Sequence, residues 1–168
     1  EQAEFWNEFY TKGLGEFFYV NKIDWHDYFD FPVGANAERE PIEQTELAEP
    51  KTALVPFGGG KDSQVTVELL RRHDIDITLF RMQSHHFITE LAEVNDAPLV
   101  EVQRALDPQL FELNKLGALN GHVPITGYVS FLTLTVGLLY GYDSIFFSNE
   151  RSSDYGNVEY LGMQVNHQ

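Results

Sequence analysis

The alternation of apolar and polar positions predicts a strand and helix repeat from residue 52 onward. Short apolar runs predict strands over 52–57, 75–81, 98–103 and 143–147. Segments with apolar residues at helical spacing lie between them and predict helices over 63–72, 87–94, 108–119 and 123–142. Strands that alternate with helices form βαβ units with right-handed crossovers. We therefore expect an α/β fold, a parallel sheet with helices on both faces.

The first 50 residues follow a different pattern, rich in aromatic and acidic side chains. The predicted elements are a helix over 2–12, short aromatic strands or loops over 16–20 and 25–31, and an exposed connection over 34–51. Gly13 and Gly15 end the first helix. This change of pattern predicts an N-terminal aromatic and acidic segment with a linker over 1–50, followed by a domain over 51–168.

Charge and cysteine content exclude several classes of function. The chain has 168 residues, with 26 Asp and Glu against 11 Lys and Arg, a formal net charge of −15 and no cysteine. Without cysteine there is no disulfide framework, thiolate metal site or cysteine nucleophile. The negative charge argues against nucleic acid and anionic membrane surfaces as partners. Residues 1–50 carry 12 acids and 3 bases, whereas residues 51–104 carry 8 and 6.

The uncharged stretch 123–142 is the segment that most resembles a membrane span. It contains several Ser, Thr, Gly and Pro residues, and a predicted strand follows at once. A membrane-spanning helix needs about 20 predominantly apolar residues. We therefore expect a buried helix packed against the sheet, no membrane partner, and a cytoplasmic protein.

A glycine-rich turn joins the first predicted strand of the sheet to its helix. The turn has the sequence Phe57-Gly-Gly-Gly-Lys61-Asp62-Ser63. Glycines permit positive φ and a close approach of an anion to the backbone N–H groups. The helix that follows offers unpaired N–H groups and a positive dipole end, with Ser63 or Asp62 as expected N-cap, and Lys61 adds a cation. The segment therefore predicts a phosphate-binding site.

Spacing separates this turn from two common phosphate-binding motifs. Walker A requires Ser or Thr after its lysine, but Asp62 follows Lys61. The dinucleotide fingerprint G-x-G-x-x-G would need glycine at Ser63. It would also need an acid at the end of the second strand, which ends in Arg81. Neither motif fits.

The turn resembles the PP-loop of ATP pyrophosphatases, S-G-G-x-D-S, with Gly58 in place of the first serine. The resemblance implies a PP-loop fold, also known as adenine nucleotide hydrolase-like, and cleavage of ATP between its α and β phosphates. It places pyrophosphate on residues 58–63, magnesium near Asp62, and adenine near Phe57 and residues 80–82. The implied cofactor-binding residues are Gly58, Gly59, Gly60, Lys61, Asp62, Ser63 and Arg81, with Asp62 as the metal ligand.

Four further segments resemble the MurL family, a group of PP-loop enzymes of peptidoglycan precursor synthesis. They are residues 13–19, 119–124, 148–152 and 165–168, in the family's order. The resemblance implies an ATP- and magnesium-dependent epimerase. Its substrate would be UDP-N-acetylmuramoyl-L-alanyl-L-glutamate, whose terminal L-glutamate is inverted to D-glutamate with release of AMP and pyrophosphate. An acyl-adenylate of the glutamate carboxylate would make the α-proton easier to remove.

Four residues are the predicted catalytic group. His167, beside Asn166, is the first choice for proton transfer because imidazole titrates near neutral pH, and a surface histidine is the alternative. Glu150 and Arg151 follow the fourth strand directly. There Glu150 would act as a base or metal ligand and Arg151 as a phosphate or carboxylate clamp, with a structural ion pair as the alternative.

Other polar residues have weaker assignments. His122 either faces the nucleotide or packs in its loop, and the pair His85-His86 has a structural or adenine-side role, not a zinc site. Asp154, Glu159 and the turn at 156–157 are expected to form a substrate loop.

Two other functions stay open from the sequence. One is a different PP-loop adenylating enzyme, an amidotransferase or ligase, and the other is a domain that binds ATP without turnover. Members of the resembled family are considerably longer than 168 residues, so we expect this chain to be a fragment. The predicted nucleotide-binding domain at 51–168 would then be incomplete at its C-terminus.

Overall fold

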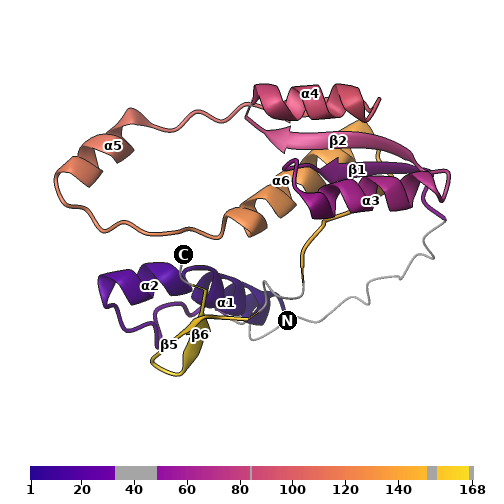
Figure 1. The fold of residues 1–168 in the computed structure, drawn as a ribbon. Coiled ribbons are helices and arrows are strands. Elements are labelled where there is room, and N and C mark those ends of the chain that lie inside the picture. Colours follow the sequence, from indigo (N-terminus) through magenta and orange to yellow (C-terminus); the bar gives the residue numbers. More distant parts are fainter. Residues whose placement is uncertain (33–48, 84, 151–154, 167–168) are drawn as a thin grey trace. The chain divides into compact units, whose positions relative to one another are not determined.

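The computed structural model describes residues 1–32, 49–83, 85–150 and 155–166 (Figure 1). The described residues form two compact units. The first unit lies within Glu1–Glu46, Asp107–Gly127 and Arg151–Gln168, and the second within Leu47–Leu106 and Tyr128–Glu150. The predicted domain division at residue 50 stays a prediction.

The second unit is an α/β sheet with the alternation that the sequence predicts. Its elements are β1 (Thr52–Pro56), α3 (Lys61–Arg71), β2 (Asp76–Met82), α4 (His86–Val94), β3 (Leu99–Val102), most of α6 (Ile125–Tyr140) and β4 (Ser144–Ile145). The strand order is β3-β2-β1-β4, and every pairing is parallel. The register places Leu54 opposite Ile145 on β4, and Arg81 of β2 opposite Glu101 of β3.

Helices cover both faces of this sheet, as predicted. Side chains alternate along a strand, so Ala53 and Val55 point to one face and Leu54 to the other. The first face packs against α3 and α4, with a core of Ala53, Val55, Phe57, Val67, Leu70, Leu79 and Ala92. The second face packs against α6, with a core of Leu54, Phe80 and Val136. Figure 1 shows α6 on the side of the sheet away from α3. Each fully buried large apolar side chain contributes about 1.5–3 kcal/mol.

Asp143 ties the start of β1 to the start of β4. Its carboxylate Oδ2 accepts hydrogen bonds from the backbone N–H of Lys51 at 3.1 Å and of Thr52 at 2.9 Å. The Thr52 hydroxyl also donates to this oxygen at 2.9 Å. These bonds, those from Thr52 first, hold the pKa of Asp143 below its ordinary value. These hydrogen bonds stabilise the pairing of β1 with the short β4 at the amino ends of the two strands.

The first unit contains α1 (Gln2–Gly13), α2 (Gly15–Asn21), α5 (Pro108–Lys115) and an antiparallel hairpin of β5 (Val158–Tyr160) and β6 (Met163–Val165). Phe18 is fully buried against Met163 and Val165. The strand-or-loop prediction for residues 16–20 is therefore wrong, because this run is helical and buries Phe18 on the hairpin. For residues 25–31, where a strand or a loop was predicted, the structure shows a loop.

Two further corrections concern this unit. Glu159 was predicted in a loop but lies in β5, where it pairs with Gln164 of β6, and its role toward the substrate stays a prediction. The helix predicted over 108–119 ends at Lys115, where Gly117 follows with a φ of +86°. The exposed connection predicted over 34–51 falls almost wholly on residues 33–48, outside the described residues.

Within the described ranges, no helix is long and apolar enough to cross a membrane. The expected cytoplasmic location stays a prediction.

Candidate functional site

The candidate site lies where the connections of neighbouring strands run in opposite directions. From β1 the chain passes through α3 to β2, whereas β4 pairs with the other edge of β1 and is reached through α6. Ligands of open α/β sheets bind at such a switch point, at the carboxyl ends of the strands. Residues 57–60 follow β1 and residues 146–150 follow β4 at this position.

The glycine turn has an open backbone. The Phe57 N–H donates to the Phe80 carbonyl at 2.8 Å and continues the pairing of β1 with β2. Gly59 has a φ of +77°, and a Cβ there would lie 2.9 Å from Leu91 Cδ1. A Cβ on Gly58 or Gly60 would meet nothing within 4 Å. The turn therefore needs glycine at 59 for its own conformation, while the space above Gly58 and Gly60 is free for a ligand.

The start of α3 presents backbone donors. Gly60 is the N-cap in an extended conformation, and no side chain caps the helix. The first intrahelical bond runs from Gln64 N–H to the Gly60 carbonyl at 3.2 Å. The amides of residues 61–63 thus have no acceptor within the helix. The expectation that Ser63 or Asp62 is the N-cap is wrong, because Ser63 is buried and its hydroxyl donates to the Gly60 carbonyl at 2.8 Å.

Two polar contacts join α3 to the segment after β4. Lys61 Nζ lies 3.0 Å from Glu150 Oε1, so the structure brings two predicted site residues together. One turn further along α3, the hydroxyls of Thr66 and Ser148 are 2.7 Å apart. The sequence predicts no role for Thr66, whose only signal is its position one turn after Asp62. Ser148 begins the family-like segment 148–152, but no contact with α3 was predicted for it.

Glu150 and Asp62 raise the pKa of the Lys61 amino group, the hydrogen bond to Glu150 being the largest cause. The Glu150→Gln substitution should lower the pKa of Lys61 toward its ordinary value, because among the described residues Asp62 is then the one anion that still raises it. The amino group stays charged at neutral pH in both proteins. A titration of the Lys61 side chain by NMR measures the change.

Glu93→Gln is the matched control for this titration, because Glu93 is exposed on α4 and no described contact joins it to Lys61. The Lys61 titration should be the same in this control as in the wild-type chain. An unchanged Lys61 titration in Glu150→Gln would contradict the ion pair.

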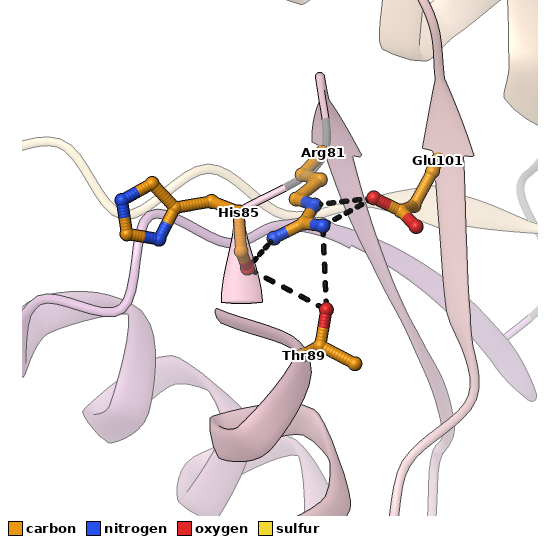
Figure 2. A network of polar contacts seen from close by, with 4 residues as sticks. All are labelled: Arg81, His85, Thr89 and Glu101. Atoms are coloured by element: carbon orange, nitrogen blue, oxygen red, sulfur yellow. Dashed lines mark hydrogen bonds and ion pairs between the residues drawn. The ribbon is translucent and has the colours of Figure 1, made fainter. Parts of the chain in front are cut away.

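Arg81 is buried, and its guanidinium takes part in the network of polar contacts drawn in Figure 2. Its side chain is 4% exposed, and Nε donates to Glu101 Oε2 at 2.7 Å, with Nη2 donating to the same oxygen. Nη1 donates to the His85 carbonyl at 2.5 Å, and Nη2 lies 3.3 Å from Thr89 Oγ1. The guanidinium joins β2, β3 and the start of α4. Its predicted cofactor contact stays a prediction, and its geometry is that of a structural residue.

The predicted histidines that the structure describes occupy two different settings. His85 is the N-cap residue of α4 and stacks on His86, with ring centroids 5.2 Å apart. His122 lies in the first unit, where its Nδ1 contacts the Glu16 carboxylate. Glu16 was not anticipated as its partner. Among the described residues, no group of three or more His, Asp or Glu side chains could hold a metal ion.

Of the four predicted catalytic residues, Glu150 and Asn166 are described, and Asn166 lies in the first unit, apart from the glycine turn in the sequence. It lines an open cleft of about 850 Å³ in the first unit, together with Trp25, Gln164 and residues of α1. His167, Arg151 and Asp154 lie outside the described residues. The structure therefore brings together residues 58–63 and Glu150, and leaves the proton-transfer group a prediction.

Comparison with known proteins identifies relatives along the whole chain. The family model of the MurL N-terminal domain matches residues 1–168. A protein of Xanthomonas oryzae pv. oryzae is 40% identical over 168 residues, which are all of this chain and 37% of that protein. A relative from Salinispora tropica is 36% identical over 95% of this chain and 34% of its own length. A relative from a Micromonospora species is 34% identical over 95% of this chain and 35% of its own length.

Each of these three relatives is named UDP-N-acetyl-alpha-D-muramoyl-L-alanyl-L-glutamate epimerase. The chain spans about a third of the length of the curated relatives it matches.

Proposed function

The chain belongs to the MurL N-terminal domain family, and from this membership we propose that it is part of an epimerase of peptidoglycan precursor synthesis. The proposed reaction inverts the terminal L-glutamate of UDP-N-acetylmuramoyl-L-alanyl-L-glutamate to D-glutamate. We propose further that it consumes ATP with magnesium and releases AMP and pyrophosphate. The family match supports the reaction, and the geometry of the glycine turn supports the use of ATP.

One observation carries the ATP proposal, namely the open glycine turn at the switch point of the sheet. Free space above Gly58 and Gly60, unpaired amides at residues 61–63 and the cation of Lys61 lie at the carboxyl end of β1. Backbone donors at a helix N-terminus bind phosphate groups. The net charge of −15 repels an anionic ligand at long range. Local donors must therefore supply the affinity for ATP.

Activation of the carboxylate explains why an epimerase would consume ATP. Removing the α-proton next to a carboxylate would place a second negative charge on the same group. A carboxylate oxygen that attacks the α-phosphorus of ATP forms an acyl-adenylate, and the bond to the β-phosphate breaks to release pyrophosphate. The neutral acyl group makes the α-proton more acidic. After the proton is removed from one face and returned to the other, water hydrolyses the acyl phosphate and yields the carboxylate and AMP.

The proposal gives roles to residues of this chain. The amides of the turn and Lys61 bind the β and γ phosphates. When ATP binds, the Lys61 amino group leaves its ion pair with Glu150 and contacts the phosphate. Asp62, in the first turn of α3, is the residue that would hold magnesium, which neutralises phosphate charge when bound. Glu150 is placed to act as a base or a second metal ligand. His167 with Asn166 stays the proposed proton-transfer group, and Arg151 the proposed clamp for phosphate or carboxylate.

Reaction in D₂O tests this proposal. A protein of the relatives' length that contains this chain is incubated with the L-glutamate substrate, ATP and magnesium. We expect deuterium at the α-carbon of glutamate, D-glutamate in the product, and AMP with pyrophosphate. Reactions without ATP should give none of these products.

The same assay with ammonia separates the alternatives. An amide product without D-glutamate would identify an amidotransferase or ligase. ATP binding without release of pyrophosphate would identify a domain that binds the nucleotide without turnover. Epimerisation in the absence of ATP would contradict the adenylation step but would still support the epimerase reaction.

A further inference from the structure

Helix α6 packs one of its faces on the sheet. Its 16 residues include no charged side chain. Thr133, Val136 and Gly137 are buried, and Val136 packs with Leu54 of β1 and Phe80 of β2. This inner face accounts for part of the apolar surface of the helix.

The outer face of α6 is equally apolar and is exposed. We define it by its large side chains, of which Leu138 and Leu139 are each 76% exposed. The outer face comprises Tyr128, Phe131, Leu134, Leu138 and Leu139. A helix that is apolar all round is typical of a protein interior, and contiguous exposed apolar surface marks an interaction site.

The neighbouring strand also ends the sheet. β4 pairs with β1 on one edge, and in the described part of the chain no strand pairs with its other edge. Parallel sheets are ordinarily covered on both faces and have short or protected edges. Helix α6 leads directly into β4, and Ile145 of β4 packs in the same core cluster as Val136 of α6.

The length of the relatives indicates what covers this surface. The whole chain matches them, yet it spans about a third of their length, so about twice as much polypeptide lies outside the match. A second copy of this chain is a poor alternative because each copy carries a net charge of −15. We propose that the outer face of α6 and the edge of β4 form the interface with the remaining polypeptide of a protein of the relatives' length. This interface does not depend on the use of ATP.

Cysteine labelling tests the interface, because the chain has no cysteine of its own. Leu138→Cys is prepared in two proteins, the 168-residue chain and a fusion of this chain with the unmatched part of the Xanthomonas oryzae relative. Maleimide labelling of position 138 is followed by peptide mass spectrometry. We expect the labelling rate to fall at least tenfold in the fusion, because the remaining polypeptide covers the helix.

Val94→Cys is the matched control. Val94 is 82% exposed at the end of α4, on the opposite face of the sheet. It should be labelled at the same rate in both proteins. Equal rates for position 138 in the two proteins would overturn the proposal. A different outcome would be that, in the 168-residue chain, protection of position 138 increases as the protein concentration is raised. That result would identify a second copy as the occupant of the surface and would also overturn the proposal.

Discussion

Gly58→Val should weaken the binding of ATP strongly while leaving the fold intact. A Cβ at this position meets no protein atom within 4 Å, and its φ is not in the left-handed region, so the side chain fits the turn. The valine methyl groups would occupy the space in which we propose that phosphate binds. We expect ATP affinity to fall by at least about 100-fold, which corresponds to about 2.7 kcal/mol. Isothermal titration calorimetry with Mg·ATP measures the affinity, and urea unfolding measures the stability.

Two variants complete this experiment. Ala105→Val adds the same side chain in an exposed loop after β3 and should change neither ATP affinity nor stability. Gly59→Val should lower the free energy of unfolding, because position 59 has a φ of +77° and its Cβ would approach Leu91 Cδ1 to 2.9 Å. If Gly58→Val binds ATP as tightly as the wild-type chain, phosphate does not bind over this turn. A wild-type chain that binds no ATP would count equally against the site.

Arg81→Met should destabilise the second unit strongly. The substitution removes the cation from the buried network and takes from the Glu101 carboxylate the guanidinium that donates to it, whereas the His85 carbonyl keeps the N–H donors of Ile88 and Thr89. Breaking a buried ion pair costs about 3–5 kcal/mol. Glu101 is 32% exposed and can be partly hydrated, so we expect a loss of about 2–4 kcal/mol. Urea unfolding followed by circular dichroism measures this loss.

Arg72→Met is the control for the loss of an arginine, because Arg72 is exposed at the end of α3. We expect a change in unfolding free energy of about 0.5 kcal/mol or less. The Arg81 variant also decides between two roles. Unchanged stability with lost ATP affinity would restore the cofactor contact that the sequence predicts. Lost stability with ATP affinity retained at low temperature would establish the structural role.

The alternation of strands and helices from residue 52 could be predicted because its signals are local. Thr52–Pro56 is short, apolar and β-branched, and the glycine turn after it precedes a run of helical spacing. Each boundary of β1, β2, β3, α3 and α4 lies within two residues of its prediction. The glycine turn could be identified for the same reason, because the need for glycine at Gly59 is a property of the local backbone.

Two elements of the first unit could not be predicted because distant contacts decide them. The aromatic run at residues 16–20 is too short for its period to separate strand from helix. Its helix is stabilised where Phe18 is buried on Met163 and Val165, which are far away in the sequence. The hairpin of β5 and β6 turns at Leu161 and Gly162, both with positive φ. Leucine is not among the residues that favour this conformation, so the turn signal was weak.

By itself, the sequence determined the α/β class and the family resemblance, because these depend on residues that are neighbours in the chain, and for the same reason it could predict a phosphate site at the glycine turn. Only the tertiary structure decided which polar side chains meet. It placed Lys61 against Glu150 at the switch point, because β4 pairs beside β1. It also directed Arg81 into the protein, because the parallel register sets Arg81 beside Glu101. Strand order and register are long-range pairings, and hydrophobic spacing along the chain does not encode them.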